Sequence, residues 1–238
     1  MPDRIILINK PYRWTSFDVV KKFKKPLLDE KKAEHATEAG LIIKKYKVGH
    51  AGTLDPLATG LLIICSGKLT RSINEIQDAE KEYTGTITIG AETESYDLEK
   101  NPINFKSFAH VTDEDIIKEA TGFLGKQMQT APIHSAKKIE GKRAYEMARR
   151  GENFEIKPNE IFIKEFEITA NRLPEIDFRI VCSKGTYIRS LAYEMGRRLG
   201  TGGYLSALCR TRIGHFLLKD AQSPLDFLKE LSDMQLIK

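Results

Sequence analysis

The chain has little cysteine and no long apolar run. Only three of its 238 residues are cysteines, Cys65, Cys182 and Cys209, and none belongs to a C-x-x-C motif. An odd cysteine count without a signal peptide indicates a reducing compartment. The apolar run at residues 5–8 is too short for a signal peptide or a membrane span. We therefore expect a cytoplasmic protein that does not associate with membranes.

The sequence also lacks motifs for nucleotides and metals. A P-loop around Lys68 fails, because Leu62 stands where the first glycine should be and another leucine follows the lysine. No G-x-G-x-x-G fingerprint is present. The five histidines do not pair at helical spacing, so His50 and Asp55 make a poor zinc site. We expect no metal and no cofactor.

Composition and charge describe a folded protein with an uneven distribution of cations. Apolar residues make up 41% of the chain and charged residues 30%, which is typical of a soluble globular protein. The net charge is +5, and residues 134–216 hold sixteen Lys and Arg against ten Asp and Glu. Such an excess is expected of a surface that faces a polyanion, although an ordinary solvated basic face has the same composition.

Residue patterns predict a mixture of strands and helices. Strands are expected at residues 4–9, 61–65, 82–90, 161–170, 176–182 and 205–216. The expected helix caps are Ser16, Thr112 with Asp115 as a capping box, Thr186 and Ser223 ahead of Pro224. Residues 21–46 are rich in lysine and predict a helix that breaks near Gly40. The pattern favours an α+β fold, a sheet with flanking helices.

One stretch, residues 47–60, combines three glycines with a single carboxylate, Asp55. Gly49 and Gly52 allow sharp turns and a close approach to another molecule. Pro56 keeps Asp55 out of the α conformation. The apolar strand at 61–65 follows, so a lone acid lies on a tight loop beside a rigid element, where chemistry is often placed. The alternative is a surface turn in which Asp is only a turn former.

The motif Gly-His-Ala-Gly-Thr-Leu-Asp-Pro-Leu-Ala-Thr-Gly at 49–60 resembles the catalytic loop of the TruB family of tRNA pseudouridine synthases. Further blocks resemble the same family in the same order. They are Lys-Pro-x-x-x-Thr-Ser at 10–16, the Tyr83–Asp97 region, Pro-x-x-Ser-Ala at 132–136 with the basic residues after it, and Gly-Thr-Tyr-Ile-Arg at 185–189. Arg13 departs from the family pattern, which often has glycine at that position.

The resemblance implies roles for individual residues. Asp55 would be the catalytic nucleophile or base, Arg189 its ion-pair partner, and Tyr83 the ring that stacks on the target base. Tyr187 and Leu208 would line the base pocket, and His50 would fill the space that a flipped uridine leaves. Lys10 would shape the pocket or contact phosphate. A guanidinium suits a carboxylate because it donates two parallel hydrogen bonds.

The resemblance also implies a fold, a substrate and a domain organisation. The fold would be the pseudouridine synthase catalytic fold, with a mixed, mostly antiparallel sheet. A basic insertion at about 127–152 would grip RNA through the side chains of Lys137, Lys138, Lys142 and Arg143. The substrate would be the TΨC stem-loop of tRNA. We expect a monomer in which residues 1–238 form a single catalytic domain without the C-terminal PUA domain that many family members carry.

Two other functions are compatible with parts of the sequence. A non-catalytic module on the same fold could bind and remodel RNA without chemistry, but Asp55, Tyr83 and Arg189 are all present. A metal-dependent RNA hydrolase would need clustered carboxylates, and the Asp55 region has only one. Isomerisation of uridine to pseudouridine needs no redox change and no departing group, so one ionised acid meets its needs.

Overall fold

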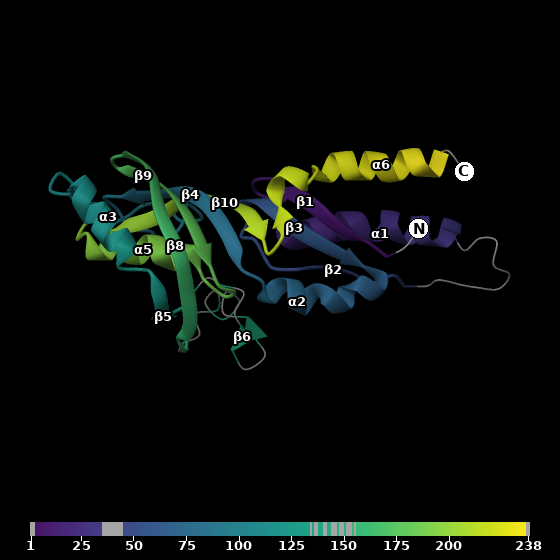
Figure 1. The fold of residues 1–238 in the computed structure, drawn as a ribbon, viewed down its shortest axis with the longest axis horizontal. Coiled ribbons are helices and arrows are strands. Elements are labelled where there is room, and N and C mark those ends of the chain that lie inside the picture. Colours follow the sequence, from purple (N-terminus) through teal and green to yellow (C-terminus); the bar gives the residue numbers. More distant parts are fainter. Residues whose placement is uncertain are drawn as a thin grey trace. The chain divides into compact units, whose positions relative to one another are not determined.

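The computed structural model describes residues 3–34, 45–133, 135, 138–139, 142–143, 147, 150, 154 and 156–236. The chain forms two compact units, traced in Figure 1. Unit 1 comprises Met1–Lys81 and Cys209–Lys238, and unit 2 comprises Glu82–Leu208. Strand β10 (Gly203–Ile213) carries the chain from unit 2 back into unit 1. The prediction of a single catalytic domain stays a prediction.

In unit 1 the sheet is built around β3 (Thr59–Ser66), which is buried along almost its whole length. Its antiparallel neighbours are β1 (Ile5–Lys10) and β2 (Val48–His50). Cys209 and Arg210 of β10 pair with Thr59 and Gly60 in parallel. The apolar run predicted at 61–65 is thus a central strand, and its Leu61, Ile63 and Cys65 side chains form a core with Ile76 and Ile213.

The helices of unit 1 accompany this sheet. The longer helices are α1 (Ser16–Glu34) and α6 (Pro224–Leu236), and the shorter ones are η1 (Gly67–Ser72), α2 (Ile73–Asp78) and η2 (Leu218–Asp220). A short strand, β11 (Phe216–Leu217), pairs with β10. Phe23 and Phe227 join α1 to α6, with ring centroids 4.7 Å apart. Ser223 accepts a hydrogen bond from the backbone N–H of Asp226, as predicted for this helix start.

The start of α1 corrects one prediction. Thr15, not Ser16, caps this helix, because the Thr15 hydroxyl accepts from the N–H of Asp18 at 3.0 Å. The Asp18 carboxylate accepts in return from the N–H of Thr15 at 2.8 Å. The Ser16 hydroxyl bonds instead to the backbone of Leu54, accepting from its N–H at 2.8 Å. Of the Lys-rich segment, α1 is described as far as Glu34, and the break expected near Gly40 lies outside the described residues.

In unit 2 the strands lie in the order β10, β4, β9, β8, β5. Their bounds are β4 (Lys81–Ile89), β9 (Glu175–Cys182), β8 (Asn159–Arg172) and β5 (Gly125–Gln129). Both β8–β9 and β5–β8 pair antiparallel. A separate hairpin joins β6 (Lys138–Ile139) to β7 (Lys142–Arg143).

Among the described residues of unit 2, α3 (Asp113–Thr121) and α5 (Ile188–Arg198) accompany the sheet. The capping box predicted at Thr112 and Asp115 is confirmed. The cap predicted at Thr186 is wrong, because the N-cap residue is Tyr187, which provides no side-chain cap. The Thr186 hydroxyl donates instead to the carbonyl of Ser183 at 3.0 Å.

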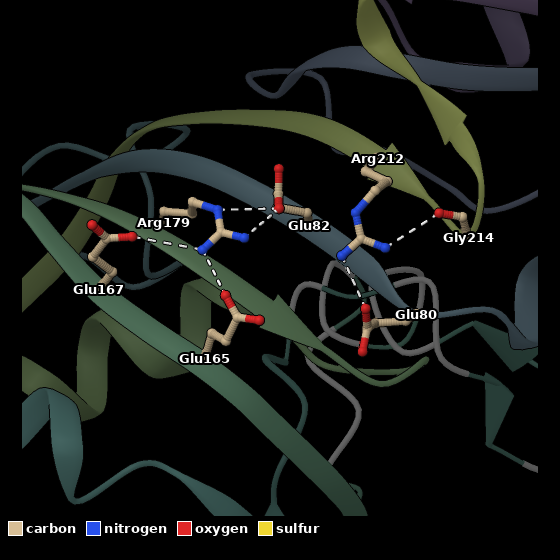
Figure 2. A network of polar contacts seen from close by, with 7 residues as sticks. All are labelled: Glu80, Glu82, Glu165, Glu167, Arg179, Arg212 and Gly214. Carbon is tan, nitrogen blue, oxygen red and sulfur yellow. Dashed lines mark hydrogen bonds and ion pairs between the residues drawn. The ribbon is translucent and has the colours of Figure 1, made fainter.

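One cation connects three strands of unit 2. Arg179 on β9 donates to Glu82 on β4 at 2.7 Å and to Glu165 on β8 at 2.6 Å, and it lies 3.6 Å from Glu167. Figure 2 shows the three carboxylates around the guanidinium. The same figure shows Arg212 of unit 1, which donates to Glu80 at 2.9 Å.

The predicted fold class is confirmed. Apart from the parallel contact between β3 and β10, the pairs with a described register are antiparallel, and helices flank the strands. This is a mixed, mostly antiparallel α+β fold.

Candidate active site

The loop between β2 and β3 holds Asp55 in a defined backbone geometry. Gly52 and Gly60 have φ values of +104° and +99°, a region that favours glycine. A Cβ atom at Gly60 would lie 2.4 Å from the carbonyl oxygen of Arg210, so a larger residue does not fit. Asp55 is half-buried, and its carbonyl accepts from the N–H of Ala58 at 3.1 Å. The positive φ values and the close packing at Gly60 restrict the loop backbone, and its acid is accessible in part.

Lys10 supports this loop from within the protein. Its side chain is fully buried at the end of β1. The ammonium donates to three backbone carbonyls, those of Pro11 at 3.0 Å, Trp14 at 2.5 Å and Pro56 at 3.4 Å. Burial lowers the pKa of Lys10 to about 8, and the nearby Asp55 carboxylate opposes that shift while Arg210 adds to it. The structure thus places the predicted residues Lys10 and Asp55 close enough to interact electrostatically.

A second buried cation, Arg210 on β10, was not predicted from the sequence. It is 1% exposed. Its guanidinium donates to the carbonyls of Leu61 at 2.8 Å, Gly52 at 3.0 Å and Thr53 at 3.4 Å. The rigid guanidinium plane therefore connects both ends of the Asp55 loop.

His50 and Gly49 lie at the start of the same loop. His50 ends β2 opposite Ile64 and is half-buried. Gly49 was expected to allow a sharp turn, but it is part of β2, where a Cβ atom would lie 2.9 Å from the Cδ1 atom of Ile73. This glycine permits close packing within the unit.

In unit 2 the predicted residue Arg189 is buried and held by the turn at 95–97. Its Nη1 atom donates to the carbonyl of Ser95 at 3.1 Å and lies 3.5 Å from Oδ2 of Asp97. The Asp97 carboxylate also accepts from the Ser95 hydroxyl at 2.6 Å and from the N–H of Glu99 at 3.0 Å. Arg189 and Asp97 are 4% and 5% exposed, so both charges are buried as a pair. The guanidinium is therefore pre-positioned by its own unit.

Hydrogen bonds at the start of α5 hold the residues before and after Arg189. The Gln129 side chain accepts from the N–H of Tyr187 at 2.8 Å and donates to its carbonyl at 3.0 Å. The Ser190 hydroxyl donates to the carbonyl of Thr130 at 3.0 Å. These bonds hold Tyr187 and Ser190 in place, but none accepts from an N–H of the first helical turn, as the side-chain cap expected from Thr186 would have done.

The other predicted site residues have different surroundings. Tyr83 is a buried residue of β4, and Leu208 is a half-buried residue of β10. Lys138, Lys142 and Arg143 belong to the β6–β7 hairpin, and Lys137 lies outside the described residues. Asp55 and Arg189 belong to different units, and their ion pair stays a prediction.

Among the residues that the structure describes, no three His, Cys, Asp or Glu side chains gather as a metal site would require. In the same residues, no helix has both the length and the hydropathy to cross a membrane.

Two contacts at the candidate site could not be predicted from the sequence, that of Arg189 with Asp97 and that of Arg210 with the Asp55 loop. The block at 83–97 that resembles the family ends at Asp97, but the resemblance does not pair this acid with Arg189. Arg210 stands in a strand pattern whose other residues suggest ordinary alternation. Both guanidinium groups bind acceptors that are distant in sequence. Arg210 and Leu61 are 149 residues apart, and Arg189 and Ser95 are 94 residues apart. Local patterns carry no signal of such contacts.

Comparison with known proteins connects this geometry to a family. Residues 41–188 match the family model described as TruB family pseudouridylate synthase (N terminal domain). A protein of Flavobacterium johnsoniae named tRNA pseudouridine synthase B is 50% identical over 218 residues, 92% of this chain and 91% of that protein. A protein of Parabacteroides distasonis with the same name is 46% identical over 229 residues, 95% of this chain and 93% of that protein.

Solved structures agree on the fold. A chain in a Cbf5-Nop10-Gar1 complex superposes with a TM-score of 0.68 at 26% identity, over 94% of this chain and 53% of that chain. This chain therefore spans about half the length of that structural relative. The archaeal box H/ACA sRNP Nop10-Cbf5 complex gives a TM-score of 0.66 at 23% identity. On the family match and these relatives, the chain belongs to the TruB family of pseudouridylate synthases, which are isomerases.

Proposed function

We propose that this chain converts uridine to pseudouridine at position 55 in the TΨC arm of tRNA, with Asp55 as the catalytic nucleophile or base. The proposal rests on family membership, on relatives named tRNA pseudouridine synthase B, and on the motif around Asp55. The observation that carries it is the placement of Asp55, a half-buried carboxylate on a loop fixed by the buried cations Lys10 and Arg210.

The chemistry requires an anion and a way to hold a detached base. The N1–C1′ bond of uridine breaks and a C5–C1′ bond forms, while the base loses a proton at C5 and gains one at N1. Asp55 either forms and releases an adduct or transfers protons. The target base is extruded from the RNA stack at a cost of a few kcal/mol, which stacking on Tyr83 offsets.

The buried pair of Arg189 and Asp97 supports a role for that guanidinium at the site. Asp97 and Ser95 bind one side of Arg189, and this orients the side chain before RNA is bound. We propose that Arg189 then keeps Asp55 charged and directed at the base. Tyr187 and Leu208 would line the pocket, His50 would occupy the vacated stack, and Lys138, Lys142 and Arg143 would contact phosphates as part of the β6–β7 hairpin.

The test is incubation with unmodified tRNA transcript, followed by mapping of pseudouridine. The wild-type chain should modify position 55, and Asp55→Asn should reduce turnover by at least roughly a thousandfold, since an amide is neither a nucleophile nor a base here. Asp233→Asn, a change at an exposed acid of α6, is the matched control and should retain full activity. A fully active Asp55→Asn variant that binds tRNA normally would refute the role of Asp55.

A further inference from the structure

A surface with exposed aromatic rings and cations lies on unit 1, over the turn before α1 and the first turns of that helix. We call it the α1 surface and define it as Tyr12, Arg13, Trp14, Phe17, Lys21 and Lys22. Tyr12 is 49% exposed and Phe17 67% exposed, which is unusual for large rings. Arg13, Lys21 and Lys22 are also exposed. None of these residues has a part in the chemistry proposed above.

Cations and rings are paired on this surface. The Arg13 guanidinium lies 5.6 Å from the centroid of the Tyr12 ring, and the Lys22 ammonium lies 5.3 Å from the centroid of the Trp14 ring. Both distances are in the range of cation–π contacts. The surface therefore offers flat apolar faces and positive charge within the same turn.

The α1 surface is attached directly to the Asp55 loop. The N–H of Arg13 donates to the carbonyl of Pro56, next to Asp55, at 2.8 Å. The Trp14 carbonyl accepts from the buried Lys10 ammonium. Hydrogen bonds within unit 1 thus fix the position of the α1 surface relative to the Asp55 loop. A molecule whose reacting group lies at Asp55 would have this surface beside it.

The backbone of Arg13 supports a functional reading. Its φ is +67°, a left-handed conformation that is strained for a residue with a Cβ atom. A long cationic side chain occupies a position where glycine is sterically preferred. Such outliers are concentrated at binding and catalytic sites.

We propose that the α1 surface binds the substrate RNA next to the target uridine, with its cations on phosphates and Phe17 or Tyr12 stacked on a base. This inference rests on the proposed function. The charge favours a polyanion, since residues 12–25 present Arg13 and four exposed lysines against one acid, Asp18, whose carboxylate is already bound by Thr15. Aromatic faces beside cations are the usual platform for unpaired nucleotides.

The experiment measures binding of unmodified tRNA transcript to the full chain across a range of KCl concentrations, together with kcat and KM. Phe17→Ala should weaken binding roughly 10-fold without changing its salt dependence, because stacking involves no released counterion. Lys21→Gln should weaken binding and reduce the slope of log Kd against log salt by about 1. Both should raise KM and leave kcat unchanged. Phe17→Tyr keeps a stacking ring and should retain wild-type affinity.

Matched controls come from the exposed side of α6 in the same unit. Leu225 is 66% exposed and Lys229 is exposed, so Leu225→Ala removes a large exposed apolar side chain elsewhere and Lys229→Gln repeats the loss of a lysine charge. They should alter Kd by less than about twofold. Melting temperatures close to that of wild type would show that every variant is folded.

Two results would overturn the proposal. The first is equal Kd values for the test variants and the control variants. The second is an unchanged slope of log Kd against log salt for Lys21→Gln. If this surface binds a protein instead, the tRNA affinities will not change and the RNA assignment is wrong. Failure of the proposed function can be told apart from failure of this inference. If the wild-type chain binds tRNA but forms no pseudouridine, the proposed function is wrong, and the Kd values of the variants still test whether the α1 surface binds RNA.

Discussion

Two buried cations, Lys10 and Arg210, accompany the single carboxylate of Asp55, and their burial has an energetic cost. A fully buried ammonium loses its hydration, and the three carbonyl acceptors and Asp55 offset that loss only in part, since the pKa of Lys10 falls from 10.5 to about 8. The ammonium binds one carbonyl of the Asp55 loop, that of Pro56, and two carbonyls of the turn before α1, those of Pro11 and Trp14. The energetic cost of burying the Lys10 ammonium should therefore appear as a dependence of the free energy of unfolding on pH.

We predict that the free energy of unfolding of the wild-type chain rises with pH above about 8, relative to Lys10→Met. Between pH 8 and 10.5 the unfolded chain holds a proton on Lys10 that the folded chain has lost, so stability increases with pH in this window. At about pH 9.5 the gain over pH 7 should be about 2 kcal/mol. Urea unfolding at several pH values measures it.

Lys229→Met is the control for this effect, because Lys229 is an exposed lysine of α6. Its stability should follow that of the wild type across the same pH range. A constant difference between wild type and Lys10→Met from pH 7 to 9.5 would contradict the lowered pKa of Lys10.

Residues also show where sequence reasoning succeeds and where it ends. The turn at Gly52 follows from a residue type that allows a positive φ, whereas the bonds from Lys10 and Arg210 that hold the Asp55 loop come from distant residues. The hydroxyl of Ser16 looked like a helix cap, but it bonds to Leu54, 38 residues away, and Thr15 takes the cap. A local pattern can show that a side chain is able to bond, but not which distant partner will occupy it.

At the scale of elements, the Arg179 cluster joins β4, β8 and β9 across one face of the sheet in unit 2 (Figure 2). One guanidinium offsets the charges of Glu82, Glu165 and Glu167. The pKa of Arg179 is raised, chiefly by its hydrogen bonds to Glu165 and Glu82. An isolated surface ion pair contributes little, but a shared cation also prevents repulsion among three acids.

We therefore predict that Arg179→Met destabilises the chain by about 1 kcal/mol at neutral pH. The destabilisation should shrink towards pH 4, because protonated carboxyl groups no longer repel one another. Arg197→Met is the comparison, since Arg197 is an exposed residue of α5 that bonds only to Glu194 among the contacts described for it. Urea unfolding at pH 7 and pH 4 gives both values, and an equal effect of the two substitutions would argue against a role for the cluster.

The elements themselves could largely be predicted, because apolar periodicity and caps act over a few residues. The strand at 61–65, the capping box at Thr112 and the start of α6 at Ser223 are all confirmed. The start of α5 is different, since no local side chain caps it and Tyr187 is held instead by Gln129 of β5. Gln129 and Tyr187 are 58 positions apart in the sequence and meet only in the folded sheet. A short stretch of sequence therefore cannot indicate this contact.

At the scale of the whole molecule, the proposed RNA contacts come from both units. The β6–β7 hairpin contributes Lys142 from unit 2, and the α1 surface contributes Lys21 from unit 1. Family resemblance indicated the first region, whereas the exposed rings, the cations beside them and the φ of Arg13 indicated the second. If both regions hold the same RNA, they must contact different phosphates.

Substitutions in the two regions should then be additive. We predict that Lys21→Gln and Lys142→Gln each reduce the slope of log Kd against log salt by about 1, and that the double variant reduces it by about 2. The losses in log Kd should also sum, because independent sites show little coupling. Titration of unmodified tRNA at four or more KCl concentrations measures both quantities. A double variant no weaker than either single variant would mean that the two lysines act at one contact, and RNA binding through two separate regions would then have to be abandoned.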